Sequence, residues 1–191
     1  MSASSCPESA ADQARAERIE VARAAGRGDA EAVRQLVSAT SAVVWRTCAA
    51  LVDRGTAEDL TQDTYLRAIR SIGSYRGDSD PTRWLLTIAR RVCAEEIGRR
   101  QRDRFTERRL AARRSRDGSD PHALTELTDG LSRLSPQRRE AFVLTAVAGL
   151  SYAEAAEVCG CPVGTIRSRV SRARTELACA LTEDPTVLIA R

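Results

Sequence analysis

Arginine and hydroxyl side chains gather near the C-terminus, in a pattern suited to the base edges and phosphates of duplex DNA. The guanidinium of arginine bonds two acceptors on a guanine edge, with roughly 1–3 kcal/mol of discrimination, or binds a phosphate. A solvated basic helix in a small helical bundle is the alternative explanation of the same pattern. The residues that we expect to contact DNA are Thr165, Arg167, Ser168, Arg169 and Arg172.

Two short helices with a glycine turn between them are predicted to position these side chains. Ser151 and Glu154 form a capping box, which starts the first helix. Gly160 supplies the left-handed turn, and Pro162 suits the first position of the second helix, where no N–H is needed. This pattern is typical of a helix-turn-helix, whose second helix enters the major groove. The buried stripe of that helix is expected to be Ile166, Val170, Ala173 and Leu177.

A second candidate site is an acidic face on the helix that follows Thr56. Glu58, Asp59, Gln62 and Asp63 share this face at helical spacing. The helix dipole favours acidic residues in a first turn, which is a sufficient reason for Glu58 and Asp59 alone. Asp63 lies beyond that turn, so the cluster favours a docking surface for a basic partner. The apolar side of the same helix is expected to be Leu66, Ile69 and Ile72, with Leu60 and Tyr65 flanking it.

A third candidate site combines the polar loop at residues 73–80 with the helix that begins near Pro81. On that helix, Arg83, Thr87 and Arg90 form an outward row, whereas Leu85, Ile88 and Val92 point inward. Arginines beside an aromatic-bearing loop are typical of proteins that bind single-stranded nucleic acid. The alternative is that the arginines are solvated and that Trp84 is core, the role we favour for Trp84. The loop residues of interest are Ser74, Tyr75 and Arg76.

Composition and charge favour helices and a bipartite chain. Aromatic residues are only 4% of the 191 residues, so the cores must be built from Leu, Val, Ile and Ala. The net charge is +4, but residues 99–116 hold nine arginines against two acidic residues, a local charge of +7. Such a run repels itself and is usually flexible. We predict an all-α protein of two small helical domains joined by a flexible basic linker, the C-terminal domain being the helix-turn-helix.

The domain boundaries follow from these patterns, with Gly98 expected to end the first compact unit. We predict a disordered N-terminus at residues 1–15, a first helical domain at 16–98, the basic linker at 99–121, the helix-turn-helix domain at 122–182 and a tail at 183–191.

Neither a membrane segment nor a metal site is expected. No apolar run approaches the roughly 20 residues of a membrane span, and the N-terminus lacks a signal-peptide layout, so we expect a cytoplasmic protein. The six cysteines are then expected to be reduced, small buried hydrophobes. Cys159 and Cys161 are one residue apart and His122 is the only histidine, which lacks the usual zinc spacing. We therefore expect no metal and no other cofactor.

Five motifs in order resemble those of bacterial RNA polymerase sigma factors of the sigma-70 family, in the extracytoplasmic-function (ECF) group. The resemblance covers roughly residues 19–181, and its first and last motifs are specific in combination. The motifs are AEDLTQDTYL at 57–66, WLLTIAR at 84–90, LSPQRREA at 134–141, GLSYAEAA at 149–156 and GTIRSR at 164–169.

The resemblance implies roles that the residues alone leave open. It implies that Asp59, Gln62 and Asp63 dock on the clamp helices of the large polymerase subunit. It implies that the loop at 74–80 and the helix from Arg83 capture the −10 element with one base flipped, and that the helix after Pro162 reads the −35 element. It also implies that the linker threads toward the RNA path of the polymerase, that an anti-sigma factor holds the protein inactive, and that the regulon is linked to stress or the envelope.

Two other function classes fit the sequence less well than a non-catalytic initiation factor. A repressor or response regulator needs only the C-terminal unit and leaves the acidic face unexplained, and no strand–helix receiver pattern is present. An enzyme acting on nucleic acid needs carboxylates on different elements, whereas Asp59 and Asp63 share one helix face. Transcription in vitro with added core polymerase distinguishes an initiation factor from a simple DNA binder.

Overall fold

A computed structural model describes residues 7–111 and 126–183, and in these ranges the chain is helical and contains no strand. The all-α prediction is confirmed. The elements are α1 (Pro7–Gly26), α2 (Ala30–Leu51), α3 (Ala57–Ser71), the 3₁₀ turn η1 (Ile72–Ser74), α4 (Pro81–Ala111), α5 (Glu126–Arg133), α6 (Pro136–Phe142), the π-helical turn η2 (Val143–Val147), α7 (Tyr152–Cys159) and α8 (Val163–Glu183).

Two helices extend past predicted boundaries. Helix α1 begins at Pro7, inside the stretch that was expected to be disordered up to residue 15. Helix α4 continues through Gly98 as far as Ala111, so the first part of the predicted linker is helical. Residues 1–6, the linker from 112 to 121 and the tail from 184 lie outside the described residues.

Ion pairs explain why α4 does not stop at Gly98. The guanidinium of Arg100 binds Glu96 one turn earlier and also reaches Asp53, in the loop between α2 and α3. It donates a further hydrogen bond of 3.0 Å to the hydroxyl of Thr56. A glycine inside a helix costs only about 1 kcal/mol relative to alanine, which several charge-assisted hydrogen bonds offset.

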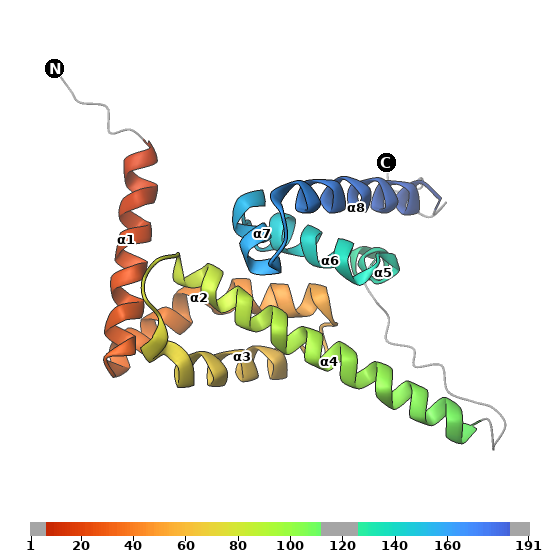
Figure 1. The fold of residues 1–191 in the computed structure, drawn as a ribbon, viewed down its shortest axis with the longest axis horizontal. Helices are drawn as coiled ribbons and strands as arrows, with labels where there is room; N and C mark the ends of the chain where they lie inside the picture. The colour runs from red at the N-terminus through yellow and green to blue at the C-terminus, as the bar shows by residue number, and fades with distance from the viewer. Residues whose placement is uncertain (1–6, 112–125, 184–191) are drawn as a thin grey trace.

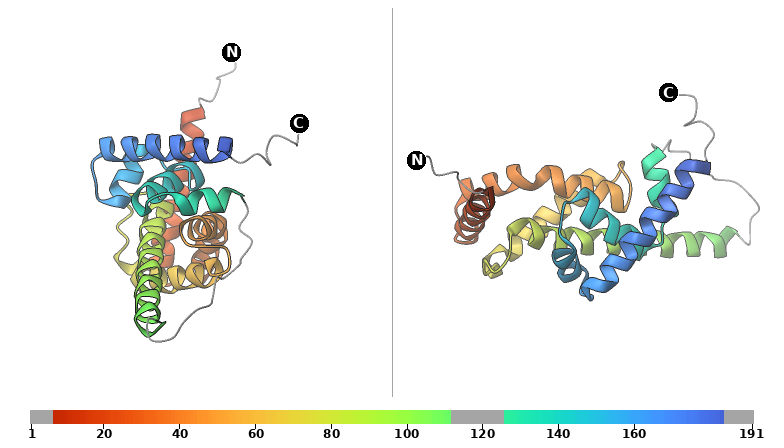
Figure 2. Two further views of the ribbon diagram at one scale, coloured as in Figure 1. Left: turned by 90° about the vertical axis from the view of Figure 1, so that its right-hand side faces the viewer. Right: turned by 90° about the horizontal axis from the view of Figure 1, so that it is seen from above.

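The helices lie in three levels (Figure 1). Helix α3 is on one side, α2 and α4 lie in the middle, and α5 to α8 lie on the opposite side, with α8 outermost. The turned view in Figure 2 shows the same order. Helix α1 packs across the ends of α2 and α4. The candidate sites on α3 and α8 therefore face opposite ways.

Two buried clusters hold these levels together. The larger one joins α1 to α4 and extends to Leu131, Leu134, Val143 and Ala173 of the C-terminal unit. The smaller one lies between α6, α7 and α8, and it also contains Leu86 of α4, which is fully buried. The two units thus share apolar contacts.

Candidate nucleic-acid and partner interfaces

The turn between α7 and α8 has the predicted geometry. The hydroxyl of Ser151 accepts from the backbone N–H of Glu154 at 3.2 Å, and the Glu154 carboxylate accepts from the backbone N–H of Ser151 at 2.9 Å. Gly160 ends α7 in the left-handed region, with φ of 64°. The capping box and the glycine turn are confirmed.

Helix α8 begins one residue later than expected. The carbonyl of Pro162 accepts from the N–H of Thr165 at 2.9 Å, so Pro162 precedes the first turn rather than belonging to it. Ile166, Val170 and Ala173 are buried as predicted, and Leu177 is half-buried.

Most of the predicted DNA-contacting side chains on α8 are open to solvent. Arg167, Ser168 and Arg172 are exposed, whereas Thr165 and Arg169 are half-buried. A guanidinium nitrogen of Arg169 lies 4.0 Å from the sulfur of Cys161, beside the turn. The helix therefore presents an open basic face at its N-terminal half.

An apolar side chain missed by the sequence reasoning lies at the start of this face. Val163, in the first turn of α8, is 40% exposed. In DNA-binding helices, a small apolar side chain at such a position is able to contact the methyl group of thymine in the major groove. Its position directly after Pro162, ahead of the apolar stripe, was the available signal.

Helix α3 turns a different side to the core than predicted. Ile72 is buried as expected, but Leu66 is 55% exposed and Ile69 is 47% exposed, so the prediction for these two residues is wrong. The side of α3 that faces the core includes Thr64, a polar residue. Its hydroxyl donates to the carbonyl of Leu60, one turn earlier in the helix. The buried residues of α3 are Ala57, Leu60, Thr64, Tyr65 and Ala68.

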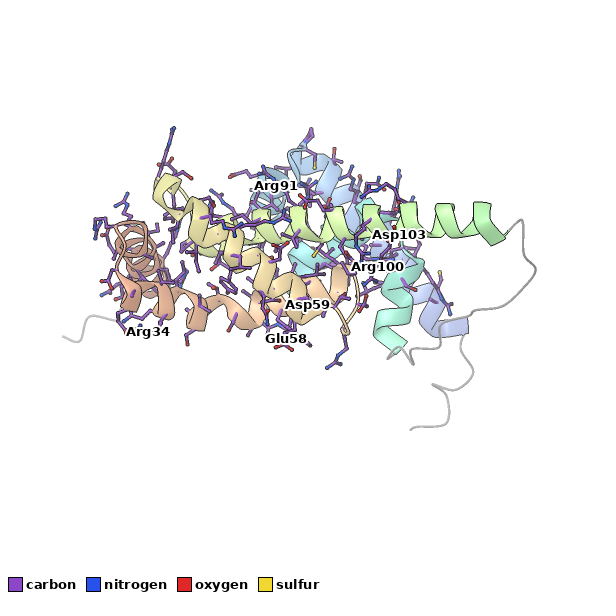
Figure 3. All side chains as sticks on the ribbon, turned by 90° about the horizontal axis from the view of Figure 1, so that it is seen from below. Arg34, Glu58, Asp59, Arg91, Arg100 and Asp103 are labelled. Atoms are coloured by element: carbon purple, nitrogen blue, oxygen red, sulfur yellow. The ribbon has the colours of Figure 1, made fainter. Side chains whose placement is uncertain are left out.

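The outward side of α3 combines acidic and apolar side chains. Asp59 and Gln62 are exposed, and Figure 3 shows Asp59 next to Glu58 on the outer surface of this helix. Asp63 binds Arg67 at 2.9 Å, and Arg67 also binds Glu95 of α4 at 2.8 Å. We call Asp59, Gln62, Asp63, Leu66 and Ile69 the α3 seam.

The loop between η1 and α4 is folded on itself. The phenol of Tyr75 donates to the carbonyl of Ser79, and its ring lies 5.5 Å from the ring of Trp84. Burial raises the pKa of Tyr75, and the nearby Asp80 adds to the shift. The side chains of Ser74 and Arg76 are exposed, while Tyr75 is half-buried.

The predicted outward row of α4 is covered by the C-terminal unit. Arg83 forms an ion pair of 2.7 Å with Glu157 of α7, and Arg90 binds Glu140 of α6. Thr87 donates to the carbonyl of Arg83 at 3.0 Å and lines a small hollow between α4 and α7. The expectation of an outward-facing row is wrong for this arrangement of the two units, because α6 and α7 pack against it.

The contact between the two units contains both apolar packing and hydrogen bonds. Leu86 inserts its side chain among the residues of the smaller cluster, and Arg139 donates to the carbonyl of Leu51 at 3.2 Å. An open groove of about 490 Å³ lies beside this contact, between α4 and α6, and is lined partly by Arg90, Arg139 and Glu140. The contact thus combines a buried leucine, a hydrogen bond from Arg139 and a groove that is open to solvent.

The cysteines of the described residues behave mostly as packing groups. Cys48 and Cys93 are buried, Cys159 and Cys161 are half-buried, and Cys179 is exposed. Burial, with Glu140 nearby, raises the pKa of Cys159 to about 12, so its thiol stays protonated and lies 3.7 Å from that carboxylate. A metal ligand or nucleophile must be a thiolate. In the described ranges, no group of three metal-ligating side chains comes together, and no helix is apolar and long enough to cross a membrane.

Two protein-family models match the chain. The model of sigma-70 region 2 matches residues 36–103, which run from α2 into α4. The model of sigma-70 region 4 matches residues 124–177, which include α7 and most of α8.

Curated relatives and solved structures agree with these matches. The ECF RNA polymerase sigma factor SigC of Mycobacterium tuberculosis is 46% identical over 162 residues, covering 82% of this chain and 87% of the relative. BldN of Streptomyces coelicolor, also an ECF RNA polymerase sigma factor, is 37% identical over 92% of this chain and 70% of its own length. The sigma factor RpoE of Bartonella quintana, solved with the anti-sigma factor NepR, has a TM-score of 0.63 at 32% identity, covering 79% of this chain and 97% of that one. CnrH, solved with the cytosolic domain of CnrY, has a TM-score of 0.67 at 27% identity, covering 87% and 98%.

Proposed function

Because this chain belongs to the ECF group of sigma-70 RNA polymerase sigma factors, we propose that three of its surfaces divide the recognition of promoter and polymerase. The face of α8 reads the −35 element through Thr165, Arg167, Ser168, Arg169 and Arg172. The −10 element is captured by Ser74, Tyr75 and Arg76 of the loop together with Arg83, Thr87 and Arg90 of α4. The clamp helices of core polymerase bind Asp59, Gln62 and Asp63.

The observation that carries the proposal is the placement of α3 and α8 on opposite sides of the molecule (Figure 1). Duplex DNA on the exposed arginines of α8 leaves the α3 seam free for the polymerase. A protein that only bound DNA would have no use for an exposed stripe of acidic and apolar side chains on the far side.

The α3 seam has the spacing of a coiled-coil contact. Asp59, Gln62, Leu66 and Ile69 follow one another at intervals of three, four and three residues, which keeps them on one side of a helix. The N-terminal half is acidic and the C-terminal half is apolar, so a complementary partner helix carries basic residues beside an apolar one. Leu66 and Ile69 therefore extend the polymerase contact beyond the acidic residues.

Serine in place of both Leu66 and Ile69 is expected to weaken binding to core polymerase about tenfold or more. Each side chain is about half exposed in the free protein, and its burial against a partner contributes roughly 1 kcal/mol. Titration of labelled protein with core polymerase measures the change. Thermal stability is expected to fall only slightly, because neither side chain belongs to the buried core.

Arginine in place of both Asp59 and Asp63 tests the acidic half of the seam in the same titration. We expect a similar loss, which shrinks at high salt because exposed charges are screened. Glu31→Arg on α2 is the control, since Glu31 is also exposed and, within the part of the chain that the structure describes, pairs only with neighbours on its own helix. If the seam variants bound core polymerase with wild-type affinity, this face would not be the binding site of the polymerase.

The contact between the two units bears on when the −10 element is read. Arg83 and Arg90 hold glutamates of the C-terminal unit, so they are not free to bind phosphates in this arrangement. Capture of the −10 element by α4 therefore requires α6 and α7 to move away, whereas the face of α8 is already open. The free protein is accordingly expected to bind a −35 duplex better than a −10 single strand.

A steep salt dependence is expected for binding of the −35 duplex, because arginine–phosphate contacts release counterions. Arg172→Ala is expected to lower the slope of log K against log salt by about one, with little change in sequence preference. Phosphate contact by α8 would be contradicted if the affinity did not change with salt and Arg172→Ala left the slope unchanged. The measurement is fluorescence anisotropy at several salt concentrations.

Regulation and location are further parts of the proposal. RpoE of Bartonella quintana was solved with the anti-sigma factor NepR, which supports an anti-sigma partner for this chain too. We propose that release from such a partner in the cytoplasm activates a regulon linked to stress or the envelope. Co-purification of the full-length protein from its own cells, before and after stress, tests this.

The function as a whole is tested by transcription in vitro. The protein supplies promoter choice and strand capture, and core polymerase supplies the chemistry, so the protein needs no catalytic activity of its own. Core polymerase with this protein is expected to initiate at a promoter that core polymerase alone ignores. Tight DNA binding without initiation would make the protein a simple DNA binder.

A further inference from the structure

Helix α1 contacts the proposed −10 loop, although it precedes the residues 36–103 that the region 2 model matches. It packs on α2, on η1 and on α4. Two arginines, Arg18 and Arg23, reach from it to opposite ends of the loop at residues 74–80. Nothing in the proposed division of labour uses either side chain.

Arg18 binds the C-terminal end of the loop. Its guanidinium donates two hydrogen bonds to one oxygen of Asp80, at 3.0 and 2.6 Å, and the side chain of Asp80 is only 15% exposed. The other oxygen of Asp80 accepts from the backbone N–H of Thr82 at 2.8 Å, which caps α4. Burial alone would raise the pKa of Asp80, but the hydrogen bonds from Arg18 and Thr82 outweigh it and lower the pKa. One carboxylate thus joins α1, the loop and α4.

Arg23 binds the other end of the loop. Its guanidinium donates to the carbonyl of Arg76 at 3.4 Å and is itself held by Glu20 at 2.8 Å. It lies directly over Gly77, where a Cβ atom would come within 2.5 Å of the Arg23 side chain. Gly77 has φ of 80°, so the glycine permits both the turn and the approach of the arginine.

We propose that α1 is a positioning element for −10 recognition, with Arg18 and Arg23 holding the loop at residues 74–80 in the shape that captures the opened strand. The inference rests on the proposed role of that loop. A loop that is ordered before binding does not lose its conformational freedom on binding, which improves affinity without adding a contact. Arg18 and Arg23 act through the loop and need not touch DNA themselves.

The experiment uses the complete protein with core polymerase and a promoter that carries a fluorescent base analogue in the −10 element. Arg18→Ala and Arg23→Ala are each expected to lower capture of the −10 strand about tenfold, the effect of 1.4 kcal/mol. Binding of the −35 duplex and of core polymerase is expected to stay unchanged. Arg18→Lys keeps one charged donor and is expected to restore part of the loss.

Arg34→Ala is the matched control, because Arg34 lies on α2 and, among the described residues, pairs only with Glu31 of the same helix. Hydrogen exchange of the backbone separates loosening of the loop from unfolding of the domain. We expect faster exchange at residues 74–80 and unchanged protection in α2 and α3.

A direct loop variant, Arg76→Ala, separates failure of the inference from failure of the proposed function. If Arg76→Ala weakens −10 capture and the two α1 variants do not, the positioning role of α1 is wrong and the function of the loop stands. If Arg76→Ala and Tyr75→Ala both leave −10 capture unchanged, the loop is not the −10 site, and the inference fails with it. Loss of −35 and −10 binding together in Arg18→Ala would show a general folding defect and would also overturn the positioning role.

Discussion

Alanine in place of both Arg167 and Arg169 is expected to lower affinity for a −35 duplex by about 30-fold or more. Each arginine that bonds a base edge contributes roughly 1–3 kcal/mol, so two together account for at least that factor. Arg167 is exposed near the start of α8, and Arg169 is half-buried beside the turn at Cys161. Electrophoretic or anisotropy titration with promoter and scrambled duplexes measures the change.

The effect of this double variant on the preference for promoter over scrambled DNA is as informative as the loss of affinity. A base contact distinguishes promoter from scrambled DNA, so its removal reduces the ratio of the two affinities as well as promoter binding. Arg46→Ala is the control, since Arg46 is exposed on α2, away from α8. If the double variant kept the wild-type ratio, α8 would bind phosphates only and could not choose promoters.

The helix-turn-helix could be predicted almost completely because its signals are local. The capping box needs only Ser151 and Glu154, and the turn needs only a residue that adopts positive φ, such as Gly160. Each of these interactions spans a few residues of the chain. The start of α8 was misplaced by one residue, because proline suits both the cap position and the first turn.

Helix α3 could not be oriented from its sequence, because two rows on it are equally regular. Leu66 and Ile69 were expected to mark the apolar side, with Leu60 and Tyr65 only flanking it. In the structure Leu60 and Tyr65 are buried, and Leu66 and Ile69 are exposed. The actual core row includes Thr64 and Tyr65, whose hydroxyls bond within the protein, Tyr65 to Thr40 of α2 at 2.7 Å. A sequence pattern does not reveal which polar groups will find partners after burial.

The length of α4 and the partial burial of its arginine row depend on contacts with residues that are far away in the sequence. Arg100 stabilises the helix beyond Gly98 through Asp53, 47 residues away. Arg90 is covered because Glu140, 50 residues away, binds it. The sequence placed Arg90 correctly on one face of a helix, but the neighbour that meets this face comes from the other unit.

Leu86→Ala is expected to release the C-terminal unit from α4 and to raise the affinity of the free protein for a −10 single strand about tenfold or more. Leu86 is fully buried, yet it packs in the cluster of α6, α7 and α8 rather than in the core of its own unit. Loss of a buried leucine costs about 2–5 kcal/mol, and here that cost falls on the contact between units. Release exposes Arg83, Thr87 and Arg90 to the strand. Strand titrations and the radius of gyration from X-ray scattering measure both effects.

The neighbouring leucine supplies a matched control for this prediction. Leu85 is equally buried but belongs to the cluster that joins α1 to α4. Leu85→Ala removes the same atoms one residue away, so it is expected to lower the melting temperature of the N-terminal unit without expanding the protein or improving strand binding. If Leu86→Ala instead behaved like Leu85→Ala, the burial of Leu86 would serve folding only. The ion pairs of Arg83 and Arg90 would then be too weak to keep the strand from α4, because partly exposed pairs contribute little alone.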